Sequence, residues 1–196
     1  MNSPSESIGL VDQFSTILKE LKGEPHLAES PDSVNSILRE IFATGNVTKL
    51  VTAGVPNDIL LNLSNSREGL EYYDLEKLEG KDALAVCEQA QAGLTWSEYA
   101  IASQGALVEI VYDDITKLAS SLPLASIVLL PASRIVPSLA EAMKKVGQVL
   151  KSQTGGSPPP VISLISGPSK TSDIELKLLY GVHGPNFLHV IILGWM

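Results

Sequence analysis

Cysteine is almost absent from this 196-residue chain, which contains a single one, Cys87. One cysteine cannot form an intramolecular disulfide, so a reducing compartment is favoured. It also cannot hold an iron–sulfur cluster, which normally needs four thiolates. Glu88 follows Cys87 and no basic residue adjoins it. We therefore interpret Cys87 as a buried structural thiol rather than a nucleophile.

Basic residues are also scarce, with 14 Lys and Arg against 22 Asp and Glu, and the formal net charge is −8. Nucleic-acid surfaces need a basic patch, so this balance argues against such a partner. No apolar run approaches the roughly eighteen residues of a membrane span. The first residues lack the charged and apolar regions of a signal peptide. We expect a cytoplasmic protein with neither a membrane span nor a nucleic-acid partner.

Several well-known catalytic and nucleotide-binding patterns are missing. Gly54 stands without the further glycines of a dinucleotide fingerprint, and no P-loop pattern occurs. Neither the Gly-x-Ser-x-Gly elbow nor a Cys/His nucleophile motif is present. These absences argue against a Rossmann dehydrogenase and against the familiar hydrolases.

The chain is instead rich in apolar residues, which make up 44% of it and suffice for a large core. Apolar residues spaced by three and four predict a helix over residues 8–21, which Gly23 and Pro25 end. A second helix is predicted over residues 32–42. We assign residues 1–45 to an N-terminal helical extension and residues 46–196 to an α/β domain.

The remainder of the chain alternates between strand-like and helix-like segments. A strand over 47–53, a helix over 54–63 and a strand over 70–73 predict a right-handed βαβ unit in a parallel sheet. Residues 93–111 predict a turn, an alternating stretch, a turn at Gly105 and a strand. About seven strands and five helices indicate a three-layer α/β fold. The other predicted elements are helices over 83–92 and 137–150 and strands over 126–130, 161–165, 174–180 and 188–193.

The richest chemistry lies between Ser166 and Pro185. An apolar, β-branched run over 161–165 predicts a buried strand, and Gly167-Pro168 predicts a turn after it. The next residues, 169–173, combine hydroxyls, one cation and one carboxylate. Open α/β sheets bind ligands at such strand ends. A helical turn beginning here would also direct free N–H groups at an anion. The alternative is that these residues only cap a short turn.

Two segments of this region resemble the carboxyl-terminal signature of the LUD-domain family of lactate-utilisation proteins. They are Ser-Gly-Pro-Ser-Lys-Thr-Ser-Asp-Ile-Glu, from Ser166, and Gly-Val-His-Gly-Pro with the following Leu-His-Val, from Gly181. Their order and spacing match the family closely. The resemblance runs from about residue 47 to residue 193.

A second family signature, a Gly-φ-Thr segment followed by Ala-Asp-x-Ala-Ile-Ala-Glu-Thr-Gly-Thr, is similar to residues 93–106. The glycine, threonine and Ala-Ile-Ala positions agree, but the family aspartate is Glu98 here. The family Glu-Thr-Gly-Thr is replaced by Ser103-Gln104-Gly105-Ala106, and a family histidine corresponds to Ser126. A serine cannot replace a carboxylate in acid–base chemistry, so any role of that pair in the family is in doubt here.

The resemblance implies a fold similar to the NagB/RpiA and coenzyme-A-transferase group. It also implies a subunit or accessory of an iron–sulfur-dependent system that oxidises L-lactate to pyruvate. Iron–sulfur clusters are then expected on partner proteins only, with no cofactor in this chain. The alternative is a stand-alone enzyme or binding protein for an anionic small molecule, namely a phosphosugar, nucleotide or acyl-coenzyme A. Whether the chain is itself an enzyme stays open, as does a homo-oligomeric state.

Candidate site residues come from both signatures. We interpret Glu98 and His183 as candidate catalytic residues, because both titrate and both lie in signature segments. No metal site is predicted, because the spacing of the histidines and carboxylates fits no standard metal signature. The candidate ligand-binding residues, expected around one crevice, are Thr95, Gly105, Ser166, Gly167, Ser169, Lys170, Thr171, Asp173 and Gly184.

Overall fold

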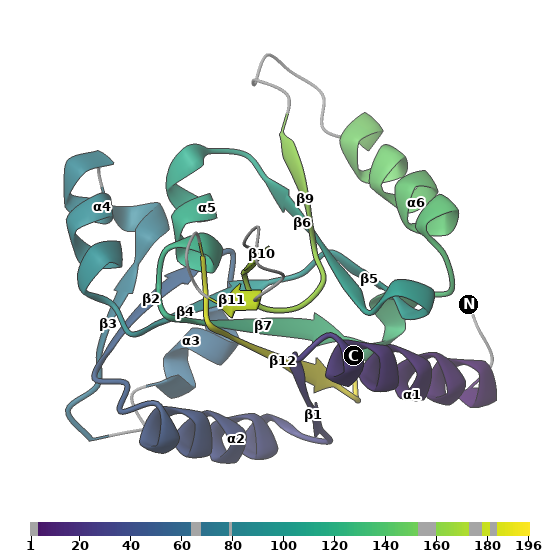
Figure 1. Cartoon of the computed structure of the whole chain (residues 1–196), viewed down its shortest axis with the longest axis horizontal. Coiled ribbons are helices and arrows are strands. Elements are labelled where there is room, and N and C mark those ends of the chain that lie inside the picture. The colour runs from purple at the N-terminus through teal and green to yellow at the C-terminus, as the bar shows by residue number, and fades with distance from the viewer. Residues whose placement is uncertain (1–3, 64–67, 79, 153–159, 173–177, 181–183) are drawn as a thin grey trace.

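The computed structural model describes residues 4–63, 68–78, 80–152, 160–172, 178–180 and 184–196. Within these ranges the chain forms an α/β fold whose largest sheet lies between helices (Figure 1). None of the helices in the described ranges is long and apolar enough to cross a membrane.

The central sheet has six strands in the order β1-β12-β7-β4-β2-β3, and every neighbouring pair is parallel. The predicted strand–helix–strand unit is confirmed, since β2 and β3 pair in parallel and α3 lies between them in the chain. The strands are β1 (Glu24–Ala28), β2 (Lys49–Ala53), β3 (Glu71–Asp74), β4 (Ala92–Trp96), β7 (Ala125–Pro131) and β12 (Phe187–Leu193).

Helices cover both faces of this sheet, as a doubly covered parallel sheet requires. Apolar residues of α2 and α3 pack on one face in a single cluster with side chains of β2, β4, β7 and β12. On the other face α1 packs against β7 and β12, and α4 and α5 pack against β2. The predicted three-layer arrangement is thereby confirmed. The helices are α1 (Pro4–Glu20), α2 (Pro31–Thr44), α3 (Asn57–Leu63), α4 (Gly80–Gln89), α5 (Asp114–Ser121) and α6 (Leu139–Ser152).

A second, mostly antiparallel sheet lies beside α1 and has the order β8-β5-β6-β9. Its inner side chains join α1 and the central sheet in one core, and α6 packs on its other side. A short hairpin of β10 and β11 follows it in the chain. The strands are β5 (Tyr99–Ile101), β6 (Ala106–Val111), β8 (Ile135–Val136), β9 (Val161–Ile165), β10 (Lys170–Ser172) and β11 (Leu178–Tyr180).

The amino-terminal segment differs from the purely helical extension that we predicted. Its two helices are present, but residues 24–28 between them form β1, which pairs with β12 at the edge of the central sheet. The sequence hid this strand because it is five residues long and contains a proline. The pyrrolidine nitrogen of Pro25 has no hydrogen to donate, which an edge strand tolerates. The domain division at residue 45 stays a prediction.

Two further segments differ from their predicted form. Residues 93–96, expected to begin with a turn, belong to β4 in the middle of the central sheet. Gly93 is required there because a Cβ would lie 1.7 Å from the carbonyl oxygen of Ala119. The run 161–165 is a strand, but it is not buried. Among the described strands it pairs only with β6, at the edge of the second sheet, and three of its apolar side chains are 39% to 49% exposed.

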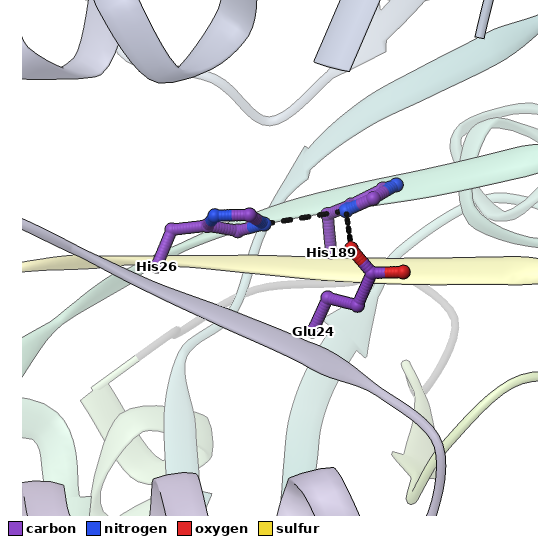
Figure 2. A group of neighbouring side chains, drawn as sticks. All are labelled: Glu24, His26 and His189. Atoms are coloured by element: carbon purple, nitrogen blue, oxygen red, sulfur yellow. Dashed lines mark hydrogen bonds and ion pairs between the residues drawn. The ribbon is translucent and has the colours of Figure 1, made fainter. Parts of the chain in front are cut away.

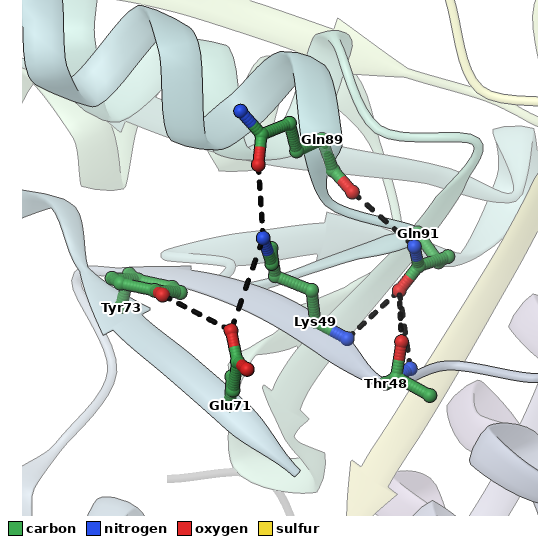
Figure 3. A network of polar contacts seen from close by, with 6 residues as sticks. All are labelled: Thr48, Lys49, Glu71, Tyr73, Gln89 and Gln91. Carbon is green, nitrogen blue, oxygen red and sulfur yellow. Dashed lines mark hydrogen bonds and ion pairs between the residues drawn. The ribbon is translucent and has the colours of Figure 1, made fainter.

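Polar side chains fix the register at the amino ends of β2, β3 and β4 (Figure 3). The side-chain oxygen of Gln91 accepts hydrogen bonds from the backbone N–H groups of Thr48, at 3.1 Å, and Lys49, at 2.8 Å. The Lys49 ammonium donates to Gln89 at 2.9 Å and lies 3.8 Å from a carboxylate oxygen of Glu71. Because these bonds join three neighbouring strands and the end of α4, the amino-terminal edge of this part of the sheet is held in register.

Candidate functional site

A cavity of about 330 Å³ lies between α5, β9 and the chain segments that carry the carboxyl-terminal signature. We call it the serine-lined cavity, because six of its lining residues are serines: Ser120, Ser121, Ser126, Ser163, Ser166 and Ser169. Lys117 is the one charged residue among the described residues that line it. Hydroxyl groups and one ammonium group are donors that suit a carboxylate or phosphate.

Ser126 has the most unusual environment of these serines. It is 2% exposed, and its hydroxyl has no hydrogen-bond partner among the described residues. A buried hydroxyl without a partner costs free energy, so a bound group that accepts or donates a hydrogen bond here would remove that cost. The sequence had identified Ser126 as a departure from a family histidine, but gave no reason to place it in a cavity.

The two halves of the carboxyl-terminal signature meet at this cavity. The backbone N–H of Ser169 donates to the carbonyl of Pro185 at 2.9 Å. A Cβ on Gly184 would lie 3.2 Å from the Cβ of Ser169, so glycine permits the close approach. Gly167 has a φ of +100°, and a Cβ there would lie 2.5 Å from the carbonyl oxygen of Leu21 just beyond α1. The predicted residues Ser166, Gly167, Ser169 and Gly184 therefore all line one cavity.

The sequence left two forms open for residues 169–173, a helical turn whose N–H groups would face an anion and a short capped turn. The described residues of this segment form neither a helical turn nor a helix N-terminus. Residues 170–172 form β10, which pairs antiparallel with β11. Residues Ser166 to Ser169, which form the turn before β10, line the serine-lined cavity.

A buried carboxyl group, Glu109 on β6, connects the serine-lined cavity to a second cavity. Glu109 is 4% exposed. It accepts a hydrogen bond at 3.0 Å from the hydroxyl of Thr95 and another from the side chain of Ser120. Burial raises the pKa of Glu109, and these two hydrogen bonds oppose the shift. A buried carboxyl with a raised pKa is a candidate general acid or base. The sequence missed Glu109 because it lies in an apolar strand outside both signatures.

The second cavity, of about 280 Å³, lies at the carboxyl ends of β2 and β4, where parallel sheets commonly bind ligands. Thr95, Glu98 and Glu109 line it. The Glu98 carboxylate forms an ion pair with Arg134, whose guanidinium also lies 5.7 Å from the centre of the Tyr99 ring. The structure thus partners Arg134 with Glu98, and this pair orients the candidate catalytic carboxylate.

Three of the remaining predicted residues, Gly105, Lys170 and Thr171, are described and are not among the residues that line these cavities. Gly105 has a left-handed φ of +55°, and a Cβ there would lie 2.8 Å from the backbone nitrogen of Leu18, so this glycine serves packing against α1. Lys170 is on β10 and is not among the residues that line the serine-lined cavity. Thr171 is also on β10. Asp173 and His183 lie outside the described residues.

The single thiol matches its predicted environment. Cys87 on α4 is 1% exposed and packs with Val51, Ala83 and Ala119. Burial raises the pKa of the Cys87 thiol to about 11. A thiol that stays protonated at neutral pH is a poor nucleophile, so Cys87 belongs to the core.

A cluster of three polar side chains, Glu24, His26 and His189, lies apart from these two cavities. It is on the α2 face of the central sheet, at the amino ends of β1 and β12. Nε2 of His26 is 3.3 Å from Nδ1 of His189, and Nδ1 of His189 is 3.3 Å from a carboxylate oxygen of Glu24 (Figure 2). Burial lowers the pKa of His189, with His26 lowering it further and Glu24 opposing. Burial also lowers the pKa of His26, whereas the negative charges of Glu24 and Glu40 raise it. Both shifts favour the neutral form of the imidazole.

A doubly covered parallel sheet, a smaller second sheet and a hydroxyl-lined cavity together define an α/β protein with a site suited to small anions. The LUD domain matches residues 11–193, so this chain belongs to the LUD-domain family. The match begins within α1, earlier than the two sequence signatures alone had indicated.

Relatives of known name agree with this assignment. The chain is 35% identical over 179 residues to lactate utilization protein C of Halalkalibacterium halodurans, covering 89% of this chain and 76% of that protein. It is 28% identical over 183 residues to lactate utilization protein C of Anoxybacillus flavithermus, covering 93% and 78%. Among solved structures, a DUF162 family protein from Deinococcus radiodurans has a TM-score of 0.68 at 20% identity, covering 96% of this chain and 98% of that chain. The last likeness establishes the shared fold.

Proposed function

We propose that this protein acts in lactate utilisation and that its serine-lined cavity binds a small organic anion. The named relatives support the first part, because they are lactate utilization proteins that match most of this chain. The cavity supports the second part, because it combines six serines, the ammonium group of Lys117 and the hydroxyl of Ser126, which has no partner in the described part of the chain. The serine-lined cavity is the observation on which the proposed binding of a small organic anion rests.

Within such a system, this chain is a subunit or accessory and not the electron carrier. Its one cysteine is buried in the core, and an iron–sulfur cluster normally needs four thiolates. Redox clusters are therefore expected on partner proteins that oxidise L-lactate to pyruvate. The contribution of this chain would be to bind a carboxylate and, through Glu109, to hold or transfer a proton near it.

Lys117 provides the sharpest test of the anion site. We expect L-lactate or pyruvate to raise the melting temperature, because a ligand at a hundred times its dissociation constant adds about 2.7 kcal/mol of stability. Lys117→Met should weaken binding roughly ten- to a hundredfold, since a hydrogen bond to a charged group contributes about 1.5–3 kcal/mol. Lys81→Met on α4, an exposed position outside this cavity, is the matched control and should bind normally.

The same thermal-shift screen should include phosphosugars, nucleotides and acyl-coenzyme A. Stabilisation by one of these, with no response to lactate or pyruvate, would favour a stand-alone protein for another anion. Equal affinity of Lys117→Met and the unaltered protein for every anion would remove the serine-lined cavity as the site. Deletion of the gene should separately slow growth of the host on L-lactate as sole carbon source, and normal growth would contradict the physiological role.

A further inference from the structure

Three side chains that were not among the predicted site residues converge on the α2 face of the central sheet. Glu24 and His26 lie on β1, and His189 lies on β12. Side chains two residues apart on a strand share a face, and Glu24 pairs directly with His189 in the parallel register. One potential ligand atom from each residue lies within 4.8 Å of the other two. Figure 2 shows His26 and Glu24 both directed at the same ring nitrogen of His189.

A single hydrogen cannot satisfy the facing nitrogen and oxygen atoms of all three side chains at once. Nδ1 of His189 contacts both Nε2 of His26 and the carboxylate of Glu24. One ring nitrogen carries at most one hydrogen. If that hydrogen points at Glu24, the lone pair of His26 lacks a donor. If His26 donates instead, the carboxylate faces the lone pair of His189. A cation placed among the three atoms would satisfy all of them together.

The spacing and the atom types both suit a transition metal. Zinc binds imidazole nitrogen at about 2.0–2.1 Å, so two ligands of a tetrahedral ion are separated by about 3.3 Å. The His26–His189 and His189–Glu24 contacts are both 3.3 Å. The Glu24 side chain is 57% exposed and can move toward His26, which lets the third pair close. Two imidazoles and one carboxylate form a recognised ligand set for zinc and iron.

The surroundings supply room and further negative charge. All three residues line a cavity of about 460 Å³, which we call the histidine cavity, and Glu40 of α2 lines it as well. Catalytic zinc sites commonly have three protein ligands and one open position for water or substrate. We propose that Glu24, His26 and His189 bind a divalent transition metal of the zinc type, with an open coordination position facing the histidine cavity. This site is independent of the anion site proposed above.

Sequence spacing did not indicate this site and had argued against a metal. His26 and His189 are 163 residues apart and come from segments predicted to belong to different parts of the molecule. The pairing of β1 with β12 brings them together, and β1 itself was not predicted. The ligand set therefore depends on a strand that the sequence did not reveal.

The test uses the full chain without a polyhistidine tag, stripped with chelator and titrated with Co²⁺ alone. We expect one Co²⁺ per chain, with visible d–d absorption bands of a low-coordinate site. Zn²⁺ should displace the Co²⁺ and abolish the bands. Glu24→Gln, at an exposed side chain that folding should tolerate, should weaken the metal at least tenfold. Glu29→Gln, an exposed carboxylate just beyond β1, is the matched control and should bind normally.

His26→Ala and His189→Ala should each abolish the absorption bands, and circular dichroism would verify that these variants are folded. Absence of saturable Co²⁺ binding by the unaltered chain up to about millimolar concentration would overturn the proposal. Binding that persists equally in Glu24→Gln and in the folded histidine variants would overturn it as well, because the metal would then lie elsewhere. None of these outcomes depends on lactate, so the result is separable from the fate of the anion site.

Discussion

The strands β12 and β9 are both short apolar runs, but β12 is buried and β9 is largely exposed to solvent. Leu188 and residues 190–193 of β12 are at most 2% exposed, because β1 and β7 flank the strand and helices cover both faces. In β9, Val161, Ile162 and Leu164 are 46%, 39% and 49% exposed, because β6 is the one strand in the described part of the chain that pairs with it. The same kind of sequence thus forms an interior strand of one sheet and the edge strand of another.

This difference teaches that an apolar run indicates a strand but does not indicate what covers it. A central parallel strand needs apolar residues on both faces, whereas an edge strand can expose one face and line a cavity with the other. Three residues of β9, Ser163, Leu164 and Ile165, line the serine-lined cavity. The serine-lined cavity therefore combines an edge strand of the second sheet with Ser126 and Leu188 of the central sheet.

The largest expected difference in stability is between alanine substitutions of two glycines. Gly93 is on β4 in the central sheet, and Gly147 is on α6, which packs on the second sheet. Gly93→Ala should destabilise the protein by more than about 4 kcal/mol, because its Cβ would overlap the backbone of Ala119 and force β4 and α5 apart. Gly147→Ala, in α6 above the second sheet, meets nothing within 4 Å and should stabilise by about 0.5–1 kcal/mol. Denaturant unfolding of both variants measures the difference. Equal effects would mean that α5 does not approach β4 so closely.

A matched pair of isoleucines tests the two strands themselves. Ile191→Ala in β12 should cost about 2–5 kcal/mol, because a fully buried side chain leaves a cavity. Ile162→Ala in β9 should cost about 1 kcal/mol or less, because this side chain is already 39% exposed. Urea unfolding midpoints with unchanged slopes would give both values. A loss at Ile162 as large as that at Ile191 would show that β9 is covered in solution.

The smallest effect concerns Glu109, at the junction between the two sheets, and it depends on pH. Burial raises its pKa above the ordinary value of 4.5. The folded protein therefore holds this proton more tightly than the unfolded chain, and that stabilisation is lost as pH rises through the folded pKa. Glu109→Gln has no charge to bury, so its stability relative to the unaltered protein should rise with pH. Each unit of the pKa difference contributes about 1.4 kcal/mol.

The measurement is the free energy of unfolding of both proteins from about pH 4 to pH 8. Glu88→Gln, an exposed position on α4, should show no such trend. A Glu109→Gln difference that stays constant over this range would mean that the folded carboxyl titrates like an unfolded one. In that case Glu109 would lose its standing as a candidate proton-transfer group.

Much of the fold followed from local pattern. Apolar spacing in residues 8–21 and 32–42 predicted α1 and α2, because one helix face must be buried. The β-branched runs predicted β2, β7 and β12. The strands β1 and β4 were missed, since Pro25 and Gly93 read as breaks when their neighbours are unknown. Pro25 is tolerated at the edge of the sheet, and Gly93 is required where α5 approaches.

The candidate site divides in the same way. The carboxyl-terminal signature identified Ser166, Gly167, Ser169 and Gly184 as a group, because a contiguous motif carries its own local geometry. Lys117 of α5 and Ser126 of β7 line the same cavity, and Glu109 of β6 accepts a hydrogen bond from Ser120, which also lines it. No short sequence pattern relates these positions. Glu98 lines a neighbouring cavity, and the pKa of Glu109 depends on burial that only the packed sheets create.

The sequence by itself determined the family, the α/β class, the inert cysteine and the hydroxyl-rich carboxyl-terminal motif, because these depend on composition and on residues close together in the chain. The tertiary structure alone decided which apolar strands are covered, which buried carboxyl has a raised pKa and which histidines meet. Those properties arise from contacts between distant segments. The 163 residues that separate His26 from His189 give no sign that parallel pairing of β1 and β12 brings their rings within 3.3 Å.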